Sequence, residues 1–303
     1  MLSKFFKNVQ AQATDRSLRF TAWALKVLPR WFIVAIMEIL FSIATLFTKR
    51  LNTICMRNLQ AVYGESKDQK EYERLTKQCI KNIGYCMMDL LYYVDRPSRL
   101  SKIVKIEHEE HLKKALDLGC GVIAVSAHLS NFPLLFVSLV QKGYKVNVII
   151  RKMRSEHFSK FMYHLCSKWN INMIQTTPRK QFLKETLNAL KRNEILFILF
   201  DETVPKEEGV EVNFFNSQVT RAIGPMLFQE RTNAPVLPIF IVKDEHKNFK
   251  IIIDEPLKVH EELNEEENIV KNISDLTNVI EKYVNIYPVQ WGGWLNKRWI
   301  VDN

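Results

Sequence analysis

The sequence predicts an α/β fold with a mostly parallel central sheet flanked by helices, because short apolar runs alternate with longer amphipathic segments. GVIAVSA (121–127), KVNVIIR (145–151) and EILFILF (194–200) are short and largely apolar, as in strands buried on both faces. The helix-length segments between them supply the crossovers that parallel strands require. Neither a linker rich in glycine or proline nor an internal repeat interrupts this part, so we expect one domain.

The other elements of this domain follow from the same periodicities. Between the three runs we expect a helix at 133–143, an amphipathic helix at 155–169, a strand at 170–176 and a helix at 178–192. Further on we expect a strand at 209–215, a helix from Thr220 through Arg231, strands at 236–242 and 249–254, and a final helix that includes 269–283. The aromatic tail WGGWLNKRW (291–299) either lies at a lipid headgroup layer or packs on the core.

The N-terminal part predicts a hydrophobic helical hairpin. WFIVAIMEILFSIATLF (31–47) is apolar, and helical periodicity continues through 50–95. Seventeen helical residues span about 25 Å, less than the roughly 30 Å of a bilayer core. Glu38, Ser42 and Thr45 share one face, which favours a helix that lies along or dips into a membrane, with a core helix of a soluble protein as the alternative. We therefore divide the chain into a membrane-associating region, 1–95, and an α/β domain, 96–303, packed as one unit.

Charge and cysteine content restrict the partners. The net charge of +10 favours an anionic membrane surface, an acidic carrier protein or nucleic acid. The basic residues are dispersed along the chain, which argues against nucleic acid. The five cysteines are an odd number without close pairing, and EHEEH (107–111) lacks the spacing of a zinc-binding helix. We expect reduced thiols and no metal site.

Polar residues follow several of the predicted strands. His128 comes just after the first run, Arg151 ends the second, and Asp201 with Glu202 follows the third. Ligands of open α/β sheets bind beyond the carboxyl ends of parallel strands, so a base, a cation and an acid should meet at one edge. Arg151 and Asp201 could instead form a structural ion pair there.

These residues lie in motifs that resemble the bacterial lysophospholipid and lipid A acyltransferase family. HLSNFPLLF (128–136) is similar to the family's histidine motif, in which an acid follows the histidine, commonly as His-x-Gly-Asn-Trp-Glu. The order of other features agrees: RNL at 57–59, the strand-end Arg151 and Asp201, GVEVNFFN (209–216), Thr220 with Gly224, NAPVLPIF (233–240) and the tryptophan-rich tail. The resemblance runs from about residue 30 to the end.

The resemblance implies a glycerolipid acyltransferase-like fold and transfer of a fatty acyl group to a hydroxyl of a membrane lipid, of lipid A or lysophospholipid type. The donor would be an acyl carrier protein or coenzyme A thioester, with no other cofactor. His128 would be the general base, a role suited to a side chain that titrates near neutrality. The implied location is the cytoplasmic face of a bacterial inner membrane, reached peripherally or through a single hydrophobic helix.

One departure from the family motif concerns its acid, because Pro133 occupies that position. Proline suits the first turn of a helix capped by Ser130 or Asn131, but it cannot orient an imidazole. Three alternatives follow: Asp201 or Glu202 reaches His128 from the neighbouring strand end, the histidine works without a carboxylate and more slowly, or the chain has lost activity. The other site residues predicted to bind substrate are Arg151, Asn131, Ser130 and Thr220. Because the motif acid is missing, a non-catalytic lipid-binding or assembly protein on the same fold is the alternative.

Overall fold

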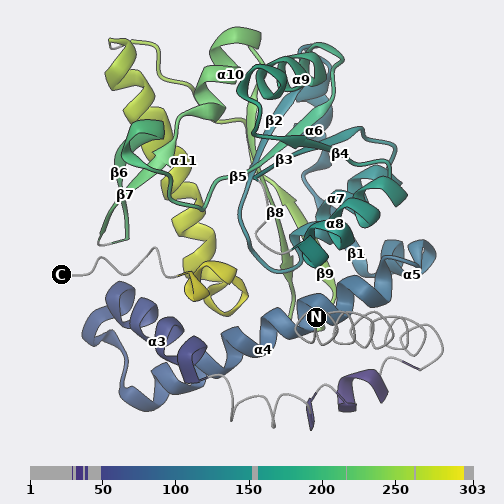
Figure 1. Cartoon of the computed structure of the whole chain (residues 1–303), viewed down its shortest axis with the longest axis vertical. Coiled ribbons are helices and arrows are strands. Elements are labelled where there is room, and N and C mark those ends of the chain that lie inside the picture. Colours follow the sequence, from purple (N-terminus) through teal and green to yellow (C-terminus); the bar gives the residue numbers. More distant parts are fainter. Residues whose placement is uncertain are drawn as a thin grey trace, which may run out of the picture.

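The computed structural model describes residues 29, 32–36, 38–39, 49–151, 156–215, 217–262 and 264–296 (Figure 1). Its centre is a seven-stranded sheet in the order β1-β9-β8-β2-β5-β3-β4. All neighbouring strands in it are parallel except β8 and β9. The strands are β1 (Val104–Glu107), β2 (Val122–Ser126), β3 (Val146–Ile150), β4 (Asn172–Gln175), β5 (Ile195–Leu199), β8 (Val236–Lys243) and β9 (Phe249–Ile253). The predicted mostly parallel α/β sheet is confirmed.

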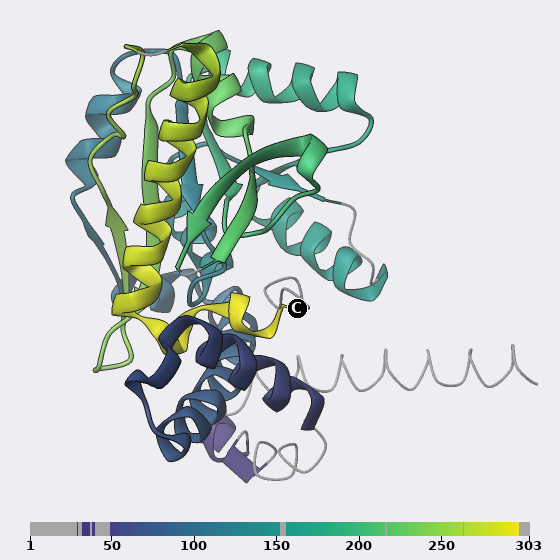
Figure 2. The same ribbon diagram turned by 90° about the vertical axis from the view of Figure 1, so that its left-hand side faces the viewer.

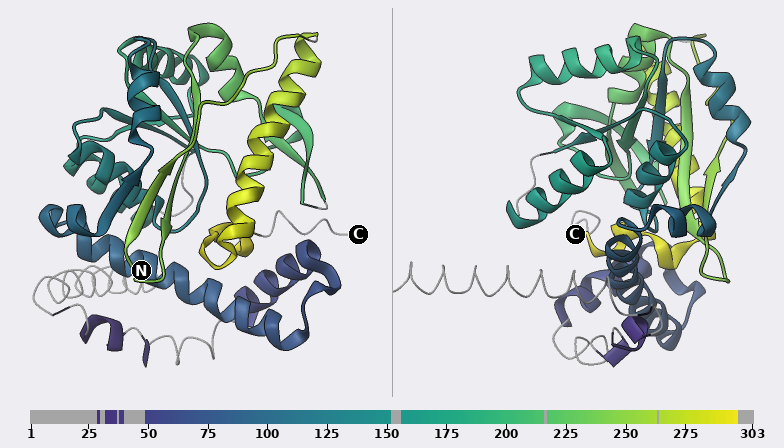
Figure 3. Two further views of the ribbon diagram at one scale, coloured as in Figure 1. Left: turned by 180° about the vertical axis from the view of Figure 1, so that it is seen from behind. Right: turned by 90° about the vertical axis from the view of Figure 1, so that its right-hand side faces the viewer.

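Helices cover both faces of the sheet (Figures 2 and 3). Apolar side chains of α6 (Glu109–Leu116), α7 (Phe132–Gln141) and α8 (Glu156–Lys168) belong to the core on one face. Those of α9 (Arg179–Lys191), α10 (Gly224–Thr232) and α11 (Glu265–Ile286) belong to the core on the other face. Strand β2 contributes to both cores, with Val122 and Ala124 on one side and Ile123 and Val125 on the other. This double burial explains why the strand is apolar throughout.

A separate layer of helices lies beyond one end of the sheet (Figure 1). It consists of α3 (Lys49–Tyr63) and the long helix α4 (Gln69–Tyr93), joined by the short helix η1 (Gly64–Ser66), and α5 (Pro97–Ile103) then leads to β1. The Asp68 side chain accepts a hydrogen bond from the Glu71 backbone at 2.7 Å and so caps α4. The predicted helices of 50–95 are therefore present.

Most of the predicted hydrophobic helix at 31–47 lies outside the described residues. Within them, 32–36 and 38–39 are helical. In the described part of the chain, no helix combines the length and the apolar character needed to cross a bilayer. The predicted division into regions 1–95 and 96–303 stays a prediction.

The expected helix from Thr220 is wrong in its first part. Residues Ser217–Ala222 form strand β7, which pairs antiparallel with β6 (Gly209–Phe214), and the helix begins only at Gly224. Arg221 within β7 is fully buried, and the segment SQVTRA is mostly polar, so it lacks the apolar pattern from which a strand is predicted. The short helix η2 (Lys206–Glu208) precedes this hairpin.

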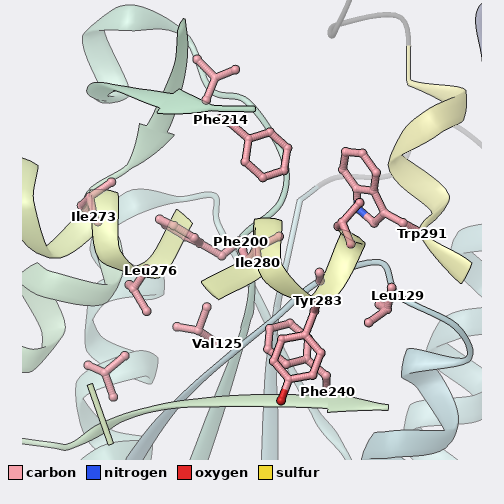
Figure 4. Packing of buried hydrophobic residues seen from close by; sticks show 14 of the residues in the cluster. Val125, Leu129, Phe200, Phe214, Phe240, Ile273, Leu276, Ile280, Tyr283 and Trp291 are labelled. Carbon is pink, nitrogen blue, oxygen red and sulfur yellow. The ribbon is translucent and has the colours of Figure 1, made fainter. Parts of the chain in front are cut away.

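The chain end returns to the helical layer after α11, through the short helices η3 (Pro288–Gln290) and η4 (Gly292–Leu295). Trp291 and Trp294 are each 1% exposed, so the two described tryptophans of the tail pack in the core rather than at a headgroup layer. Figure 4 shows Trp291 beside Phe214 and Leu129 in this core, among side chains of α11. Trp299 lies outside the described residues.

Candidate active site

The turn between β2 and α7 carries His128. Its backbone is tight: Leu129 N donates to Ala127 O at 2.7 Å, and Ser130 adopts a left-handed conformation with φ of 48°. The His128 side chain is 34% exposed, whereas the side chain of Asp201 is 2% exposed. The imidazole therefore lies at the boundary of the core, where one edge can contact a buried acid while the rest remains accessible.

Asp201 is the acid that contacts His128. Its Oδ1 lies 2.8 Å from His128 Nδ1, and its Oδ2 accepts the His128 backbone N–H at 3.0 Å. Strands β2 and β5 are neighbours in register, with Ser126 opposite Leu199. His128 and Asp201 each lie two residues beyond that pair, so their side chains leave the sheet on the same side. The following residue, Glu202, lies one step out of this register.

The hydrogen bond fixes which nitrogen of His128 is free. An ionised carboxylate only accepts hydrogen bonds, so Nδ1 carries the proton that Asp201 binds. Nε2 of the neutral ring is then available to accept a proton. The Phe132 ring packs edge-on against the imidazole at 5.0 Å between centroids, which restricts its rotation.

Electrostatic interactions favour the charged forms of both His128 and Asp201. Burial lowers the pKa of His128, but the charge and the hydrogen bond of Asp201, with a smaller contribution from the Glu202 charge, outweigh it and raise the pKa to about 9. Burial raises the pKa of Asp201, yet His128, the Trp291 N–H and the His128 backbone N–H lower it to about 2. Asp201 is therefore ionised at neutral pH and stabilises an imidazolium.

The Pro133 region keeps the backbone of the histidine motif without its acid. Pro133 lies in the first turn of α7, where the helix loses no intrahelical N–H bond. Asn131 is the residue before the helix, but its amide donates to Cys86 O of α4 at 2.7 Å instead of capping α7. The Ser130 hydroxyl is buried and has no hydrogen-bond partner among the described residues, so the expected side-chain capping is wrong.

The other predicted site residues have different surroundings. Arg151 is exposed at the end of β3, which is next to β5 in the sheet. Thr220 is 7% exposed within β7, and its carbonyl accepts the Val204 N–H at 3.1 Å. Over the described ranges, no hydrogen bond or ion pair joins either residue to the His128–Asp201 pair, and Arg151 forms no ion pair with Asp201.

Two residues beside Asp201 were missed in the sequence. Trp291 Nε1 donates to Asp201 Oδ2 at 2.8 Å. The Arg221 guanidinium stacks on the Phe214 ring at 4.5 Å from its centroid. Burial lowers the pKa of Arg221 to about 10 against the opposing charge of Asp201. No local pattern marks Arg221, which lies in the mostly polar segment SQVTRA, and no strand register relates Trp291 to Asp201.

The remaining reactive groups are the cysteines and the side chains that could bind a metal ion. The cysteines Cys55, Cys79, Cys86, Cys120 and Cys166 are all free. Among the residues that the structure describes, no cluster of at least three His, Cys, Asp or Glu side chains could hold a metal ion. His260 also contacts acids, but through both ring nitrogens, at 2.8 Å to Glu262 Oε1 and 2.9 Å to Asp275 Oδ2. The candidate base is therefore His128, which contacts Asp201 through Nδ1 alone.

Comparison with known proteins shows to which family the chain belongs. The family described as bacterial lipid A biosynthesis acyltransferase matches residues 13–300. The phosphatidylinositol mannoside acyltransferase of Mycobacterium tuberculosis strain ATCC 25618 / H37Rv is 26% identical over 131 residues, which are 43% of this chain and 41% of that protein. The protein of the same name from strain CDC 1551 / Oshkosh gives the same figures. The chain thus matches about two fifths of the length of these relatives. Because the family match covers nearly the whole sequence, the chain belongs to the bacterial lipid A biosynthesis acyltransferase family.

Proposed function

We propose that this protein transfers a fatty acyl group from an acyl carrier protein or coenzyme A thioester to a hydroxyl of a membrane lipid, of lipid A or lysophospholipid type, with His128 as the general base. The observation that carries this proposal is the 2.8 Å contact between His128 Nδ1 and Asp201 Oδ1 behind a partly exposed imidazole. Family membership supports the reaction class. In this proposal, the buried carboxylate of Asp201 takes the role of the motif acid, whose position Pro133 occupies.

The proposed reaction needs no covalent enzyme intermediate. His128 Nε2 removes the proton of the lipid hydroxyl while that oxygen attacks the thioester carbonyl carbon. Asp201 stabilises the resulting imidazolium. Backbone N–H groups at the start of α7 stabilise the oxyanion. When the tetrahedral intermediate collapses, the C–S bond breaks and the imidazolium returns its proton to the thiolate, giving an ester and a free thiol.

The acceptor is a lipid that carries a free hydroxyl on its headgroup. The relatives named phosphatidylinositol mannoside acyltransferases support a glycolipid with a phosphate near the sugar. Arg151, exposed at the end of β3, is our candidate for binding that phosphate or a phosphate of the donor, because a guanidinium binds phosphate oxygens bidentately. We also propose that Ser130, beside His128 in the turn, contacts substrate.

The test compares His128→Ala with His108→Ala on purified protein. His108 is more than half exposed and lies at the start of α6, so its replacement leaves the proposed site untouched. With an acyl carrier protein or coenzyme A thioester and a hydroxyl lipid acceptor, we expect a labelled acyl-lipid and an equal amount of thiol. His128→Ala should lower that rate by at least about 100-fold, and His108→Ala should not. Product formation that is unchanged in His128→Ala would remove His128 from the mechanism.

Because proline occupies position 133 in place of the motif acid, a second candidate function is that of a non-catalytic lipid-binding or assembly protein. The same assay separates the two functions, because that protein would bind the acceptor lipid without producing thiol or acyl-lipid. Binding of lipid with no turnover by the wild-type protein on a range of acceptors would establish this second function instead.

We also propose that the protein works at the cytoplasmic face of the inner membrane, docked through an apolar face beside the site. Glu38 pairs with Lys81 of α4 at 2.8 Å, which holds the short N-terminal helical segment against α4. The exposed apolar side chains of these two elements are Phe32, Ile36, Ile39, Ile83 and Met87. Asn131 of the histidine turn contacts Cys86 O, next to Met87, so this face lies close to the site. The net charge of +10 favours an anionic surface.

This docking face predicts a difference between two kinds of variant. Ile39→Asp combined with Met87→Asp should lower the fraction that sediments with vesicles containing anionic phospholipid severalfold, because aspartate is costly to bury among lipid chains. Leu118→Asp is the matched control, since Leu118 is 67% exposed but follows α6 at the opposite end of the sheet. Equal loss in both variants would contradict the proposed face.

A further inference from the structure

Trp291 contacts the side of Asp201 that faces away from the imidazole ring. Its indole Nε1 donates to Asp201 Oδ2 at 2.8 Å, the same oxygen that accepts the His128 backbone N–H at 3.0 Å. The other oxygen, Oδ1, accepts from His128 Nδ1 at 2.8 Å. Three donors thus divide the two oxygens between them and fix the rotation of the carboxylate. The indole is the one of the three that does not belong to His128.

The backbone around Trp291 is joined to the turn that carries His128. Trp291 forms an isolated antiparallel bridge with Leu129. On either side of it, Gln290 O accepts the Ser130 N–H at 2.7 Å, and the Gly292 N–H donates to His128 O at 2.8 Å. The chain end and the histidine turn therefore form one hydrogen-bonded unit, so the position of the indole relative to Asp201 is set by the same backbone that places the imidazole.

Aromatic neighbours hold the Trp291 ring in this orientation. Phe214 packs edge-on against it at 5.8 Å between centroids (Figure 4). Trp294 packs edge-on against it at 4.7 Å between centroids. Trp291 is 1% exposed, so water does not replace its N–H at the carboxylate. A donor that is buried, rigid and directed at a buried anion stabilises that anion more than a solvent-exposed donor would.

We propose that Trp291 is a positioning residue of the His128–Asp201 pair, holding the carboxylate in the rotation that directs Oδ1 at the imidazole and drawing negative charge toward Oδ2. This inference rests on the proposed function, in which His128 is the base. Without the indole N–H, the carboxylate rotates more freely, and more of its charge acts on the imidazolium. The first effect lowers the turnover number, and the second makes His128 harder to deprotonate.

Two other charged groups also act on the His128–Asp201 pair. Glu202 follows Asp201 and acts on His128 through its charge, and Arg221 of β7 acts on Asp201 in the same way. Neither group changes when Trp291 is replaced. A shift in the titration of His128 is therefore attributable to the lost N–H donor.

The experiment compares Trp291→Phe with Trp294→Phe. Trp294 is equally buried, and its Nε1 donates to Pro288 O at 2.7 Å. Phenylalanine at this position keeps an aromatic ring against Trp291 and removes an N–H bond that does not involve Asp201. We expect Trp291→Phe to lower kcat roughly tenfold with little change in KM, because a hydrogen bond to a charged group is worth about one factor of ten or more. The part of its pH–rate profile that rises toward alkaline pH should shift to higher pH by about half a pH unit or more. Trp294→Phe should change the stability but leave kcat and the position of this limb unchanged.

A second readout is independent of turnover. The pKa of His128, followed by NMR of the labelled imidazole, should rise in Trp291→Phe and stay unchanged in Trp294→Phe. If His128→Ala retains activity, the proposed function fails, while this titration still decides whether Trp291 acts on the pair. If Trp291→Phe does not fold, 3-benzothienylalanine at the same position keeps the ring size without the N–H. An unmoved His128 pKa, or an equal shift in both tryptophan variants, would overturn the proposal.

Discussion

At the scale of single residues, the site depends on an acid supplied by a neighbouring strand. The sequence predicted His128 and two candidate acids, because polar residues after buried strands gather at one edge of a parallel sheet. It left the choice between Asp201 and Glu202 open, since that choice depends on the register of β2 against β5. The contact of Trp291 with Asp201 could not be predicted, because Trp291 follows no strand of the sheet and no strand register relates it to Asp201.

The charged pair predicts a pH-dependent stability. The pKa of His128 is raised to about 9, so its contribution to the free energy of unfolding is fully present below its ordinary pKa and is lost as pH rises through about 9. In Asp201→Asn the charge that raises this pKa is gone, and burial alone lowers it. Urea unfolding between about pH 6.5 and 9 should therefore show a steeper loss of stability in the wild type than in Asp201→Asn. Equal slopes would mean that the pair is not charged in the folded protein.

At the scale of elements, the strand-turn-helix unit of β2 and α7 has proline in place of the acid of the family motif. The sequence predicted the strand, the helix and the place of Pro133 in the first turn, because each is a local property. The capping bonds were wrong, since the Asn131 amide is used between elements, on Cys86 O. Strand β7 was missed for the same reason: the buried Arg221 follows tertiary packing rather than local pattern.

Replacement of Pro133 tests whether this position still contributes to the chemistry. Pro133→Ala should keep acyl transfer within a few-fold of wild type, because Asp201 and not residue 133 contacts His128. It should lower the free energy of unfolding by about 1 kcal/mol, through greater freedom of the unfolded chain and lost packing of a buried ring. Kinetics and urea unfolding measure the two effects. A rate loss above about 100-fold in a folded variant would show a direct role for this turn.

At the scale of the whole molecule, the α3–α4 layer is attached to the sheet by buried polar contacts around the chain end. Lys243 Nζ of β8 lies 2.5 Å from Asp89 Oδ2 of α4. The Gln290 side chain accepts from Lys243 N and donates to Lys243 O, both at 2.8 Å. Asn58 of α3 donates to Trp294 O at 2.8 Å. These contacts join segments far apart in sequence, so composition and periodicity could not predict them.

The buried ion pair predicts strong non-additivity. Lys243→Met should lower the free energy of unfolding by about 3 kcal/mol, because Asp89, whose side chain is 1% exposed, then loses its ion-pair partner in the core. The double variant Lys243→Met with Asp89→Leu should recover much of that loss. Chemical denaturation of the two single variants and the double variant gives the coupling energy. Additive effects would show that the pair does not join the layers.

The pH dependence of kcat/KM in Asp201→Asn tests the central claim most directly, with Glu202→Gln as the matched control. The wild-type rate should rise with pH toward about 9, as His128 loses its proton. Asp201→Asn should reduce the maximum by about 100-fold or more and move the limb to lower pH, since the charge that raises the His128 pKa is removed. Glu202→Gln should stay within a few-fold of wild type with a small shift in the same direction. An unchanged limb and rate in Asp201→Asn, or the large loss in Glu202→Gln instead, would contradict the account.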